Sequence, residues 1–308
     1  MKKNVDFFSE LTTGGDARLT PARGDLAAAH LEGIVEAEHY VAGRSHEVTT
    51  FTAPLFVKPS DDGPLLTELL YGEAFEVYDQ KDGWAWGQSG HDYYVGYTPL
   101  SSLAPAREIG QEAGCTVTAT VIDAYREPDI KSPILARYPM HARLAPAGSE
   151  TVGDYRFLKV ENGAWVRADL VFEWDLERRP WPLKSDYLLL ARSFLGTPYR
   201  WGGRTVLGLD CSGLLQIACV ARLRDTDLQE REIGLRAIDV TDLPPQRGDI
   251  VFFPGHVGIM VDEKGLLHAN ARKMCLSIDP LSSVIERLAH EHDQPVRAVY
   301  RLPDGTKL

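Results

Sequence analysis

The sequence is poor in cysteine and contains no long apolar run. Four cysteines among 308 residues, Cys115, Cys211, Cys219 and Cys275, are too few for a disulfide scaffold, and none belongs to a C-x-x-C pair or a Cys/His spacing typical of zinc sites. We therefore expect reduced thiols, three of which pack as small hydrophobic side chains, and no metal or other cofactor. No window reaches the roughly 18 to 20 apolar residues of a membrane span, so no membrane-spanning helix is predicted.

Positive charge is scarce as well. The chain has 33 Lys and Arg against 44 Asp and Glu, a net charge of −11, which disfavours nucleic acid and anionic membranes as partners. The first residues, MKKNVDFFSELTTGG, begin like an export signal but reach Asp6, Ser9 and Glu10 before an apolar run of sufficient length. A cytoplasmic protein is therefore expected, or a periplasmic or secreted one if a signal segment has been removed. The composition does not decide the oligomeric state, and a monomer is compatible with it.

Proline and glycine residues divide the chain into four parts. Residues 1–44 are predicted to form an N-terminal helical segment, because apolar residues in DLAAAHLEGIVEAEHYV recur at a roughly helical spacing, at Leu26, Ala29, Leu31, Ile34, Val35 and Ala37. Residues 45–105 contain short alternating segments separated by the turns KPSDDGP, DGW and SGH, which is typical of a small all-β barrel.

Residues 112–175 repeat this pattern. Phe56 and the proline three residues after it have counterparts 69 residues later, at Tyr125 and the proline that follows it. KDGWAWG is echoed by ENGAWVR, but Trp84 and Trp165 are 81 residues apart, so this alignment requires an insertion. Two copies of one small β module explain the repeat. Both copies resemble bacterial SH3-like domains, the first closely through LLYGE and DYYVGYTPLSSL and the second less closely; any small β barrel with a buried tryptophan is the alternative.

Residues 183–308 differ in character. SDYLLLARSFLG has helical spacing with Ser185 or Asp186 as N-cap, and a second helix is predicted to begin near Cys211 and to continue through SGLLQIACVARL. GDIVFFPGHVGIMVD and GLLHAN then alternate as antiparallel strands do. Helices followed by a run of strands indicate an α+β domain.

Cys211, in GLDCSGLLQ, is the candidate nucleophile. Free cysteine is among the most often buried residue types, so the tetrapeptide DCSG alone does not decide its role. Its position favours a nucleophile, because it follows the glycine-rich loop RWGGRTVLGLD and begins an apolar run of helical length. A thiol at a helix N-terminus lies at the positive end of the helix dipole, which favours the thiolate and lowers the thiol pKa. The same place offers free backbone N–H groups to a developing oxyanion.

A cysteine nucleophile needs a base that is held in one orientation. His256, in FFPGHVGIM, is predicted to start a strand 45 residues after Cys211. His268, in GLLHAN, is predicted to lie on the next strand, across a hairpin that turns at DEKG. Antiparallel pairing in the right register brings such side chains together. The alternative is that both histidines are ordinary core or surface residues.

The two motif regions, TPYRWGGRTVLGLDCSGLLQIA and LPPQRGDIVFFPGHVGIMVDEKGLLHAN, resemble the NlpC-type family of cell-wall cysteine peptidases. The resemblance implies a papain-like fold with Cys211 as nucleophile, His256 as general base and His268 as the residue that orients the base. It also implies that Tyr199 positions the nucleophile or stabilises the oxyanion. The expected architecture is thus α+β, a papain-like cysteine peptidase domain preceded by two small all-β SH3-like barrels.

Family members with two SH3-like domains ahead of the peptidase are similar to γ-D-glutamyl-L-diamino acid endopeptidases. This resemblance implies hydrolysis of the γ-D-glutamyl to diamino acid bond in murein stem peptides that have a free N-terminal L-Ala, as in cell-wall peptide recycling. It also implies that Glu73 and Tyr94, with Asp210 and Ser212 beside the nucleophile, bind the substrate. The alternative is that Glu73 is a solvated turn residue and Tyr94 a barrel core residue.

Three other functions are compatible with the sequence. The chain is a wall-bound hydrolase acting on intact murein, or an acyltransferase that resolves the acyl-enzyme with an amine, or a non-catalytic scaffold. The third is disfavoured because all three catalytic positions of the family motif are filled.

Overall fold

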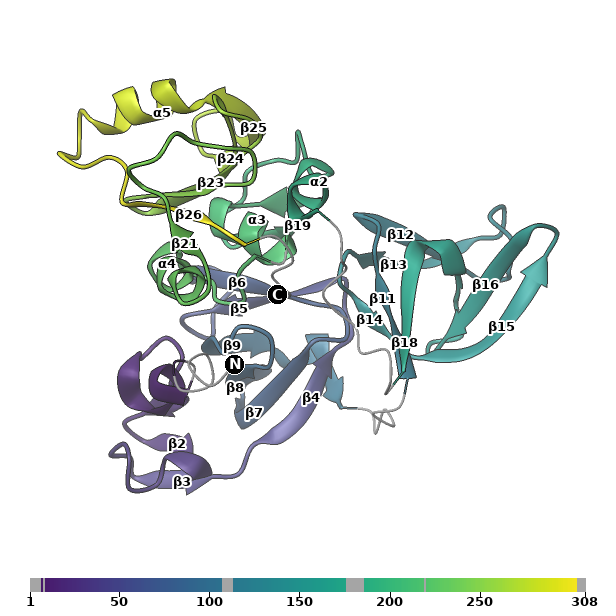
Figure 1. Ribbon diagram of the computed structural model, residues 1–308. Coiled ribbons are helices and arrows are strands. Elements are labelled where there is room, and N and C mark those ends of the chain that lie inside the picture. Colours follow the sequence, from purple (N-terminus) through teal and green to yellow (C-terminus); the bar gives the residue numbers. More distant parts are fainter. Residues whose placement is uncertain (1–6, 8, 107–112, 176–185, 219, 304–308) are drawn as a thin grey trace. The chain divides into compact units, whose positions relative to one another are not determined.

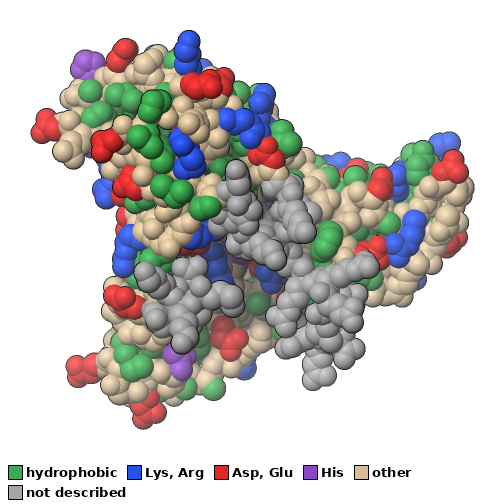
Figure 2. Space-filling view, viewed as in Figure 1, with side chains coloured by type: hydrophobic (Ala, Val, Ile, Leu, Met, Phe, Trp, Pro, Cys, Tyr) green, Lys and Arg blue, Asp and Glu red, His purple; other side chains and the backbone are tan. Residues whose placement is uncertain are grey.

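The protein is described by a computed structural model over residues 7, 9–106, 113–175, 186–218 and 220–303 (Figure 1). The chain forms two compact units, which we call the N-terminal unit (residues 6–181) and the C-terminal unit (residues 182–308). Within the described ranges, no helix is long and apolar enough to cross a bilayer. On the face drawn in Figure 2, Lys and Arg side chains are interspersed with Asp and Glu.

The N-terminal segment is not the predicted helix. Residues 7, 9 and 10 are α-helical and are followed by the short turn η1 (Leu11–Gly15). The region of the predicted helix instead contains the turn η2 (Ala29–Leu31) and a small sheet of β1 (Ala22–Arg23), β2 (Leu26–Ala28) and β3 (His39–Val41) in the order β1-β2-β3.

The helical prediction for this segment is wrong because its apolar residues serve tertiary packing. Leu26 and the two alanines after it are buried consecutively in an extended strand, and Gly33 has a φ of 78°, which ends any helix. The segment is also tied to the first barrel, since the side-chain amide of Gln88 donates to the carbonyl of Leu19 at 2.7 Å.

Seven antiparallel strands follow in the order β10-β4-β7-β8-β9-β5-β6, with a short helical turn η3 (Leu100–Ser102) before the last strand of the chain order. Their bounds are β4 (Arg44–Val48), β5 (Thr52–Phe56), β6 (Leu65–Leu70), β7 (Ala74–Lys81), β8 (Trp84–Ser89), β9 (Val95–Pro99) and β10 (Leu103–Pro105).

The next part of the chain repeats this strand order in two sheets, β14-β11-β18 and β13-β12-β17-β16-β15, with the turn η4 (Ala168–Leu170) at the equivalent place. The counterpart of β7 is split into β14 and β15. The bounds are β11 (Ala113–Val117), β12 (Val121–Tyr125), β13 (Ile134–Pro139), β14 (Arg143–Leu144), β15 (Pro146–Val152), β16 (Tyr155–Val160), β17 (Trp165–Arg167) and β18 (Val171–Asp175).

The register of the two copies matches residue by residue. Phe56 follows a register shift in its strand and pairs with Tyr97 of the neighbouring strand, and Tyr125 follows the same shift and pairs with Trp165. Trp165 is therefore the counterpart of Tyr97. The alignment of Trp165 with Trp84, which required an insertion, is wrong, because similar turn sequences precede two different strands of the module.

Tyr71, at the end of β6, joins the two copies. Its ring lies in the core of the second copy, with its centroid 4.6 Å from that of Tyr138, and its hydroxyl donates to Glu161 at 2.9 Å. Its carbonyl accepts a hydrogen bond from the backbone N–H of Arg143 at 3.0 Å. A Cβ on Gly72 would lie 2.1 Å from the Arg143 carbonyl oxygen, so glycine is required there.

The C-terminal unit is built on an antiparallel sheet in the order β21-β26-β22-β23-β24-β25 and a small hairpin of β19 and β20. The element bounds are α2 (Tyr187–Arg192), β19 (Arg204–Thr205), β20 (Gly208–Leu209), α3 (Cys211–Ile217), α4 (Thr226–Gly234), β21 (Ile238–Asp239), β22 (Ile250–Phe253), β23 (His256–Met260), β24 (Gly265–Asn270), β25 (Cys275–Pro280), α5 (Leu281–Leu288) and β26 (Ala298–Arg301).

Helices α5 and α3 pack on this sheet, and α3 brings its first residue, Cys211, to the strands that contain the two histidines. Val284 of α5 joins Val251, Phe253 and Met260 in one hydrophobic core, while α3 packs against β23 and β24. As predicted, a helix begins at Cys211, although it ends sooner than expected. Strands β23 and β24 form the hairpin predicted from the DEKG turn.

Candidate active site

Asp210 caps the helix that begins at Cys211. Its Oδ1 accepts a hydrogen bond from the backbone N–H of Gly213 at 2.8 Å and another from the hydroxyl of Ser212 at 3.2 Å. Such a cap satisfies N–H groups that have no partner within the helix. The carboxylate and the hydroxyl that flank the nucleophile in the sequence are therefore bonded to each other.

The other carboxylate oxygen of Asp210 binds groups from outside the helix. Its Oδ2 accepts from the backbone N–H of Gly202 at 2.8 Å and forms an ion pair with Arg224. Both charged residues are almost fully buried, at 3% and 2% exposure. Asp210 thus holds the glycine-rich loop and the start of α3 together.

The Cys211 thiol lies beside the first residues of β23. The residue is 8% exposed, and the sulfur is hydrogen-bonded by the backbone N–H groups of Ser212 and of Val257, which follows His256. Burial, and then the negative charge of Asp210, raise the pKa of Cys211 to about 12. The expected lowering of this pKa is wrong, because desolvation outweighs the field of a short helix. The resting sulfur is a protonated thiol.

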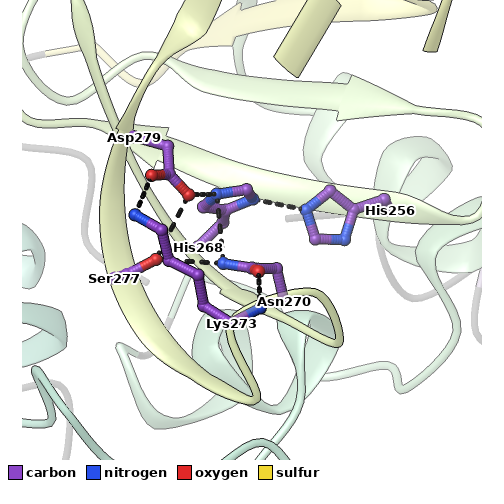
Figure 3. Close-up of polar contacts among 6 residues, drawn as sticks. All are labelled: His256, His268, Asn270, Lys273, Ser277 and Asp279. Carbon is purple, nitrogen blue, oxygen red and sulfur yellow. Dashed lines mark hydrogen bonds and ion pairs between the residues drawn. The ribbon is translucent and has the colours of Figure 1, made fainter. Parts of the chain in front are cut away.

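His256 and His268 form a hydrogen-bonded pair that ends on a carboxylate (Figure 3). Nε2 of His256 is 2.7 Å from Nδ1 of His268, and Nε2 of His268 is 3.0 Å from Oδ2 of Asp279. His268 is fully buried. Because Nε2 of His256 is occupied by this pair, Nδ1 is the ring nitrogen left to accept a proton from a thiol.

Polar residues of β24, β25 and the turn between them surround this carboxylate. The hydroxyl of Ser277 donates to Oδ2 of Asp279 at 3.2 Å, and the Lys273 ammonium forms an ion pair with Oδ1. Although burial acts to raise the pKa of Asp279, its bonds to Lys273 and His268 hold that pKa below the ordinary value. Asp279 is therefore ionised.

Both histidines are neutral at pH 7. Burial, and then the charges of His268 and Arg287, lower the pKa of His256 to about 3. Burial also lowers the pKa of His268, against the hydrogen bond and charge of Asp279. A neutral imidazole is the form that can act as a base.

Tyr199 is placed near the thiol. Its backbone N–H donates to the carbonyl of Met274 at 2.8 Å, and its main chain forms a parallel bridge with Leu209. Burial, and then the charges of Cys211 and Asp210, raise the pKa of Tyr199 to about 12. Its phenol is therefore a protonated hydrogen-bond donor.

Glu73 and Tyr94 lie at one end of the first barrel, in the N-terminal unit. Oε2 of Glu73 accepts from the backbone N–H of Leu70 at 2.9 Å, and Oε1 is 3.6 Å from Nδ1 of His91 in the turn that contains Tyr94. The two residues are 2% and 1% exposed. Glu73 is thus not a solvated turn residue, whereas Tyr94 is buried as a barrel residue is.

Asp279 and Arg224 are functional residues that were not predicted from the sequence. Asp279 reaches His268 only through the pairing of β24 with β25, and nothing in CLSIDP marks it. Of the other cysteines, Cys115 is in the core of the second copy and Cys275 is partly buried, while Cys219 lies outside the described residues. The described side chains include no group of three or more His, Cys, Asp and Glu that is arranged to hold a metal ion.

Two parts of the chain match known family models. Residues 196–290, which contain the thiol, both histidines and Asp279, match the NlpC/P60 family model. The C-terminal unit is an NlpC/P60 domain. Residues 55–103 match the model of the bacterial dipeptidyl-peptidase Sh3 domain, so an SH3 domain precedes the NlpC/P60 domain in the chain.

Relatives of the whole chain combine the same parts. Dipeptidyl-peptidase 6 of Lysinibacillus sphaericus is 25% identical over 241 residues, which cover 72% of this chain and 86% of that protein. Gamma-D-glutamyl-L-lysine dipeptidyl-peptidase of Bacillus cereus is 29% identical over 244 residues, 71% of each chain. A crystal structure of an NlpC/P60 family protein from Bacillus cereus superposes with a TM-score of 0.68 at 20% identity, covering 83% of this chain and 99% of that one. The fold is thus shared.

Proposed function

We propose that this protein is a cysteine peptidase that hydrolyses the bond between γ-D-glutamate and a diamino acid in peptidoglycan stem peptides. The observation that carries the proposal is the buried Cys211 thiol at a helix start, beside the strand that opens with His256, whose ring is hydrogen-bonded to His268 of the next strand. The names of the two dipeptidyl-peptidase relatives support the substrate class. The helix and hairpin around the thiol support a papain-like site, and the repeated strand order supports a second SH3-like barrel.

In the first stage, neutral His256 acts as general base. As the sulfur of Cys211 bonds to the γ-carbonyl carbon, the thiol proton moves to Nδ1 of His256 and the carbonyl electron pair moves onto oxygen. Backbone N–H groups at the start of α3 and the protonated phenol of Tyr199 stabilise this oxyanion. A neutral thiol and a neutral imidazole are the forms that this step consumes.

The intermediate then collapses. The C–N bond breaks, and His256 gives its proton to the leaving amine of the diamino acid, which leaves a thioester on Cys211. In the second stage the same histidine removes a proton from water, whose oxygen adds to the thioester carbon. The C–S bond breaks, the thiol regains its proton, and the γ-D-glutamyl product leaves with a free carboxyl group.

Glu73 and Tyr94 are our candidates for binding the free amine of an N-terminal L-Ala. Glu73 supports this role because it is a carboxylate that is 2% exposed, and a buried negative charge is stabilised by a cation beside it. Ser212, next to the nucleophile, is a further candidate for binding the substrate. Asp210 already binds four donor groups, so its main role is to hold the start of α3, and it affects substrate binding through the position of that helix.

A panel of muropeptides tests the proposal. We expect release of L-Ala-γ-D-Glu from L-Ala-γ-D-Glu-diaminopimelate and from its lysine analogue, no release from the N-acetylated forms, and no turnover by Cys211→Ala. Glu73→Gln should lower kcat/KM for free-amine peptides at least about tenfold, the loss of one charge-assisted contact. Unchanged kinetics for Glu73→Gln would remove the amine-binding assignment, and turnover by Cys211→Ala would remove the mechanism.

Product masses separate this proposal from its alternatives. An acyltransferase would give a new amide when an amine is added in place of water. A wall-bound hydrolase would cleave intact sacculi, releasing soluble fragments, faster than it cleaves free peptides.

A further inference from the structure

We infer that Asp279 is a positioning residue that fixes the proton-bearing nitrogen of both histidines, and so keeps Nδ1 of His256 free to accept the thiol proton. The inference rests on the proposed function. Its basis is the carboxylate at the far end of the hydrogen-bonded chain from His256, a residue that the sequence motifs do not include (Figure 3).

His268 is fully buried, and both of its ring nitrogens have protein partners. Nε2 of His268 is 3.0 Å from a carboxylate oxygen of Asp279. An ionised carboxylate only accepts hydrogen bonds, so neutral His268 carries its proton on Nε2 and donates it. Nδ1 of His268 is then an acceptor.

The tautomer of His268 determines which ring nitrogen of His256 carries the proton. Nε2 of His256 lies 2.7 Å from the Nδ1 of His268, and two acceptors cannot share that hydrogen bond. His256 therefore donates from Nε2, and its own Nδ1 has an unprotonated lone pair. The carboxylate of Asp279 thus decides the tautomer of a base with which it has no direct contact.

Asn270 competes with Asp279 for the same ring nitrogen of His268. Its side-chain Nδ2 lies 3.3 Å from the same Nε2 of His268 and is a donor, which would favour the opposite tautomer. The Asn270 amide is turned by two other bonds: Oδ1 accepts from the backbone N–H of Lys273 at 2.9 Å, and Nδ2 donates to the Ser277 hydroxyl at 3.0 Å. With the Asp279 carboxylate removed, Nδ2 is positioned to donate to His268 instead.

Charge supports the same role. When His256 becomes protonated during the reaction, the negative charge of Asp279 stabilises it through His268. Two cations oppose this effect, Lys273 on the exposed side of the carboxylate and Arg287 of α5, whose charge acts on both histidines. Asp279 therefore has both a geometric and an electrostatic part in proton transfer.

The substitution Asp279→Asn replaces this acceptor with a group that can donate, at nearly unchanged volume. Loss of a carboxylate that contacts the base directly costs about 10⁴-fold in kcat in a serine peptidase, and one imidazole further away we expect a loss of ~10- to 100-fold. The KM should stay within about threefold, since substrate contacts are unchanged. Asp279→Glu keeps an acceptor and should recover part of the lost kcat.

Asp262→Asn is the matched control. Asp262 is an exposed aspartate in the turn of the β23–β24 hairpin, where it accepts from the backbone N–H groups of Lys264 and Gly265. This variant should keep wild-type kcat. A kcat for Asp279→Asn equal to that of Asp262→Asn would overturn the inference.

A second readout does not depend on turnover. NMR spectra of isotope-labelled histidine nitrogens report which ring nitrogen carries the proton, in the resting protein without substrate. We expect His256 and His268 to be protonated on Nε2 in the wild type and to shift toward Nδ1 protonation in Asp279→Asn. Unshifted tautomers in a folded variant would refute the inference. If the tautomers shift but the wild type cleaves no muropeptide, the proposed function fails and the role of Asp279 stands.

Discussion

Removing the carboxylate of Asp210 should strongly destabilise α3, the helix that begins at Cys211. The substitution Asp210→Ala removes the cap of α3, worth about 1 kcal/mol, and separates a buried ion pair, worth about 3–5 kcal/mol because the guanidinium of Arg224 stays buried. The two effects share one side chain, so we expect a combined loss of about 4 kcal/mol.

Native-state hydrogen exchange of peptides from α3 is the suitable assay, because it reports this helix alone and does not require the two units to unfold together. A loss of about 4 kcal/mol corresponds to exchange about a thousandfold faster, since each 1.4 kcal/mol is roughly tenfold. Adding Arg224→Met to Asp210→Ala should slow exchange again, because the pair is then replaced rather than broken.

Asp239→Ala is the control, since Asp239 is an exposed aspartate of the same unit whose side chain accepts hydrogen bonds from the backbone N–H and the hydroxyl of Thr241. It should leave exchange in α3 unchanged. Exchange in Asp210→Ala within about tenfold of the wild type would refute the reasoning that Asp210 is chiefly structural, and would return it to the group of substrate-binding residues.

Two further predictions concern the pKa of His256 and the close approach of Gly72 to the Arg143 carbonyl. The acid limb of kcat/KM should lie well below pH 6.5, the ordinary histidine value, because the lowered pKa of His256 keeps the base neutral as pH falls; a limb centred at or above that value would contradict a desolvated base. Gly72→Ala should destabilise the N-terminal unit by about 2 kcal/mol or more, because Gly72 has a φ of 75° and faces the Arg143 carbonyl; hydrogen exchange in β13 and β14 measures the loss. Gly153→Ala is the control, since Gly153 has a φ of 59° but open space around it. That variant has the backbone strain without the clash, so its loss of stability should be smaller.

Local motifs were sufficient to predict the centre of the site. Cys211 follows a glycine-rich loop and begins an apolar run, and a helix does begin there. His256 and His268 are separated by a short turn between alternating segments, and hairpin pairing then brings their rings together. In these cases a local sequence pattern marks the residue itself, by a glycine-rich loop before it or by its place in an alternating segment.

The features that were missed have no local motif, although their partners are about as close in sequence as the two histidines are: Asp279 is 11 residues from His268, and Arg224 is 14 residues from Asp210. Asp279 contacts His268 through strand register, and Arg224 reaches Asp210 from the segment after α3. The pKa of Cys211 is set by burial, which a sequence pattern does not measure. The apolar spacing from Leu26 onward suggested a helix because consecutive buried residues in a strand can mimic a helical face.

The central claim is that Cys211 forms a covalent bond to the γ-D-glutamyl group. The most direct measurement is mass spectrometry of protein that is quenched in acid during turnover of L-Ala-γ-D-Glu-diaminopimelate and then digested. The account predicts an L-Ala-γ-D-Glu acyl group on the peptide that contains Cys211, absent in Cys211→Ala. An acyl group on any other residue, or turnover by Cys211→Ala, would contradict it.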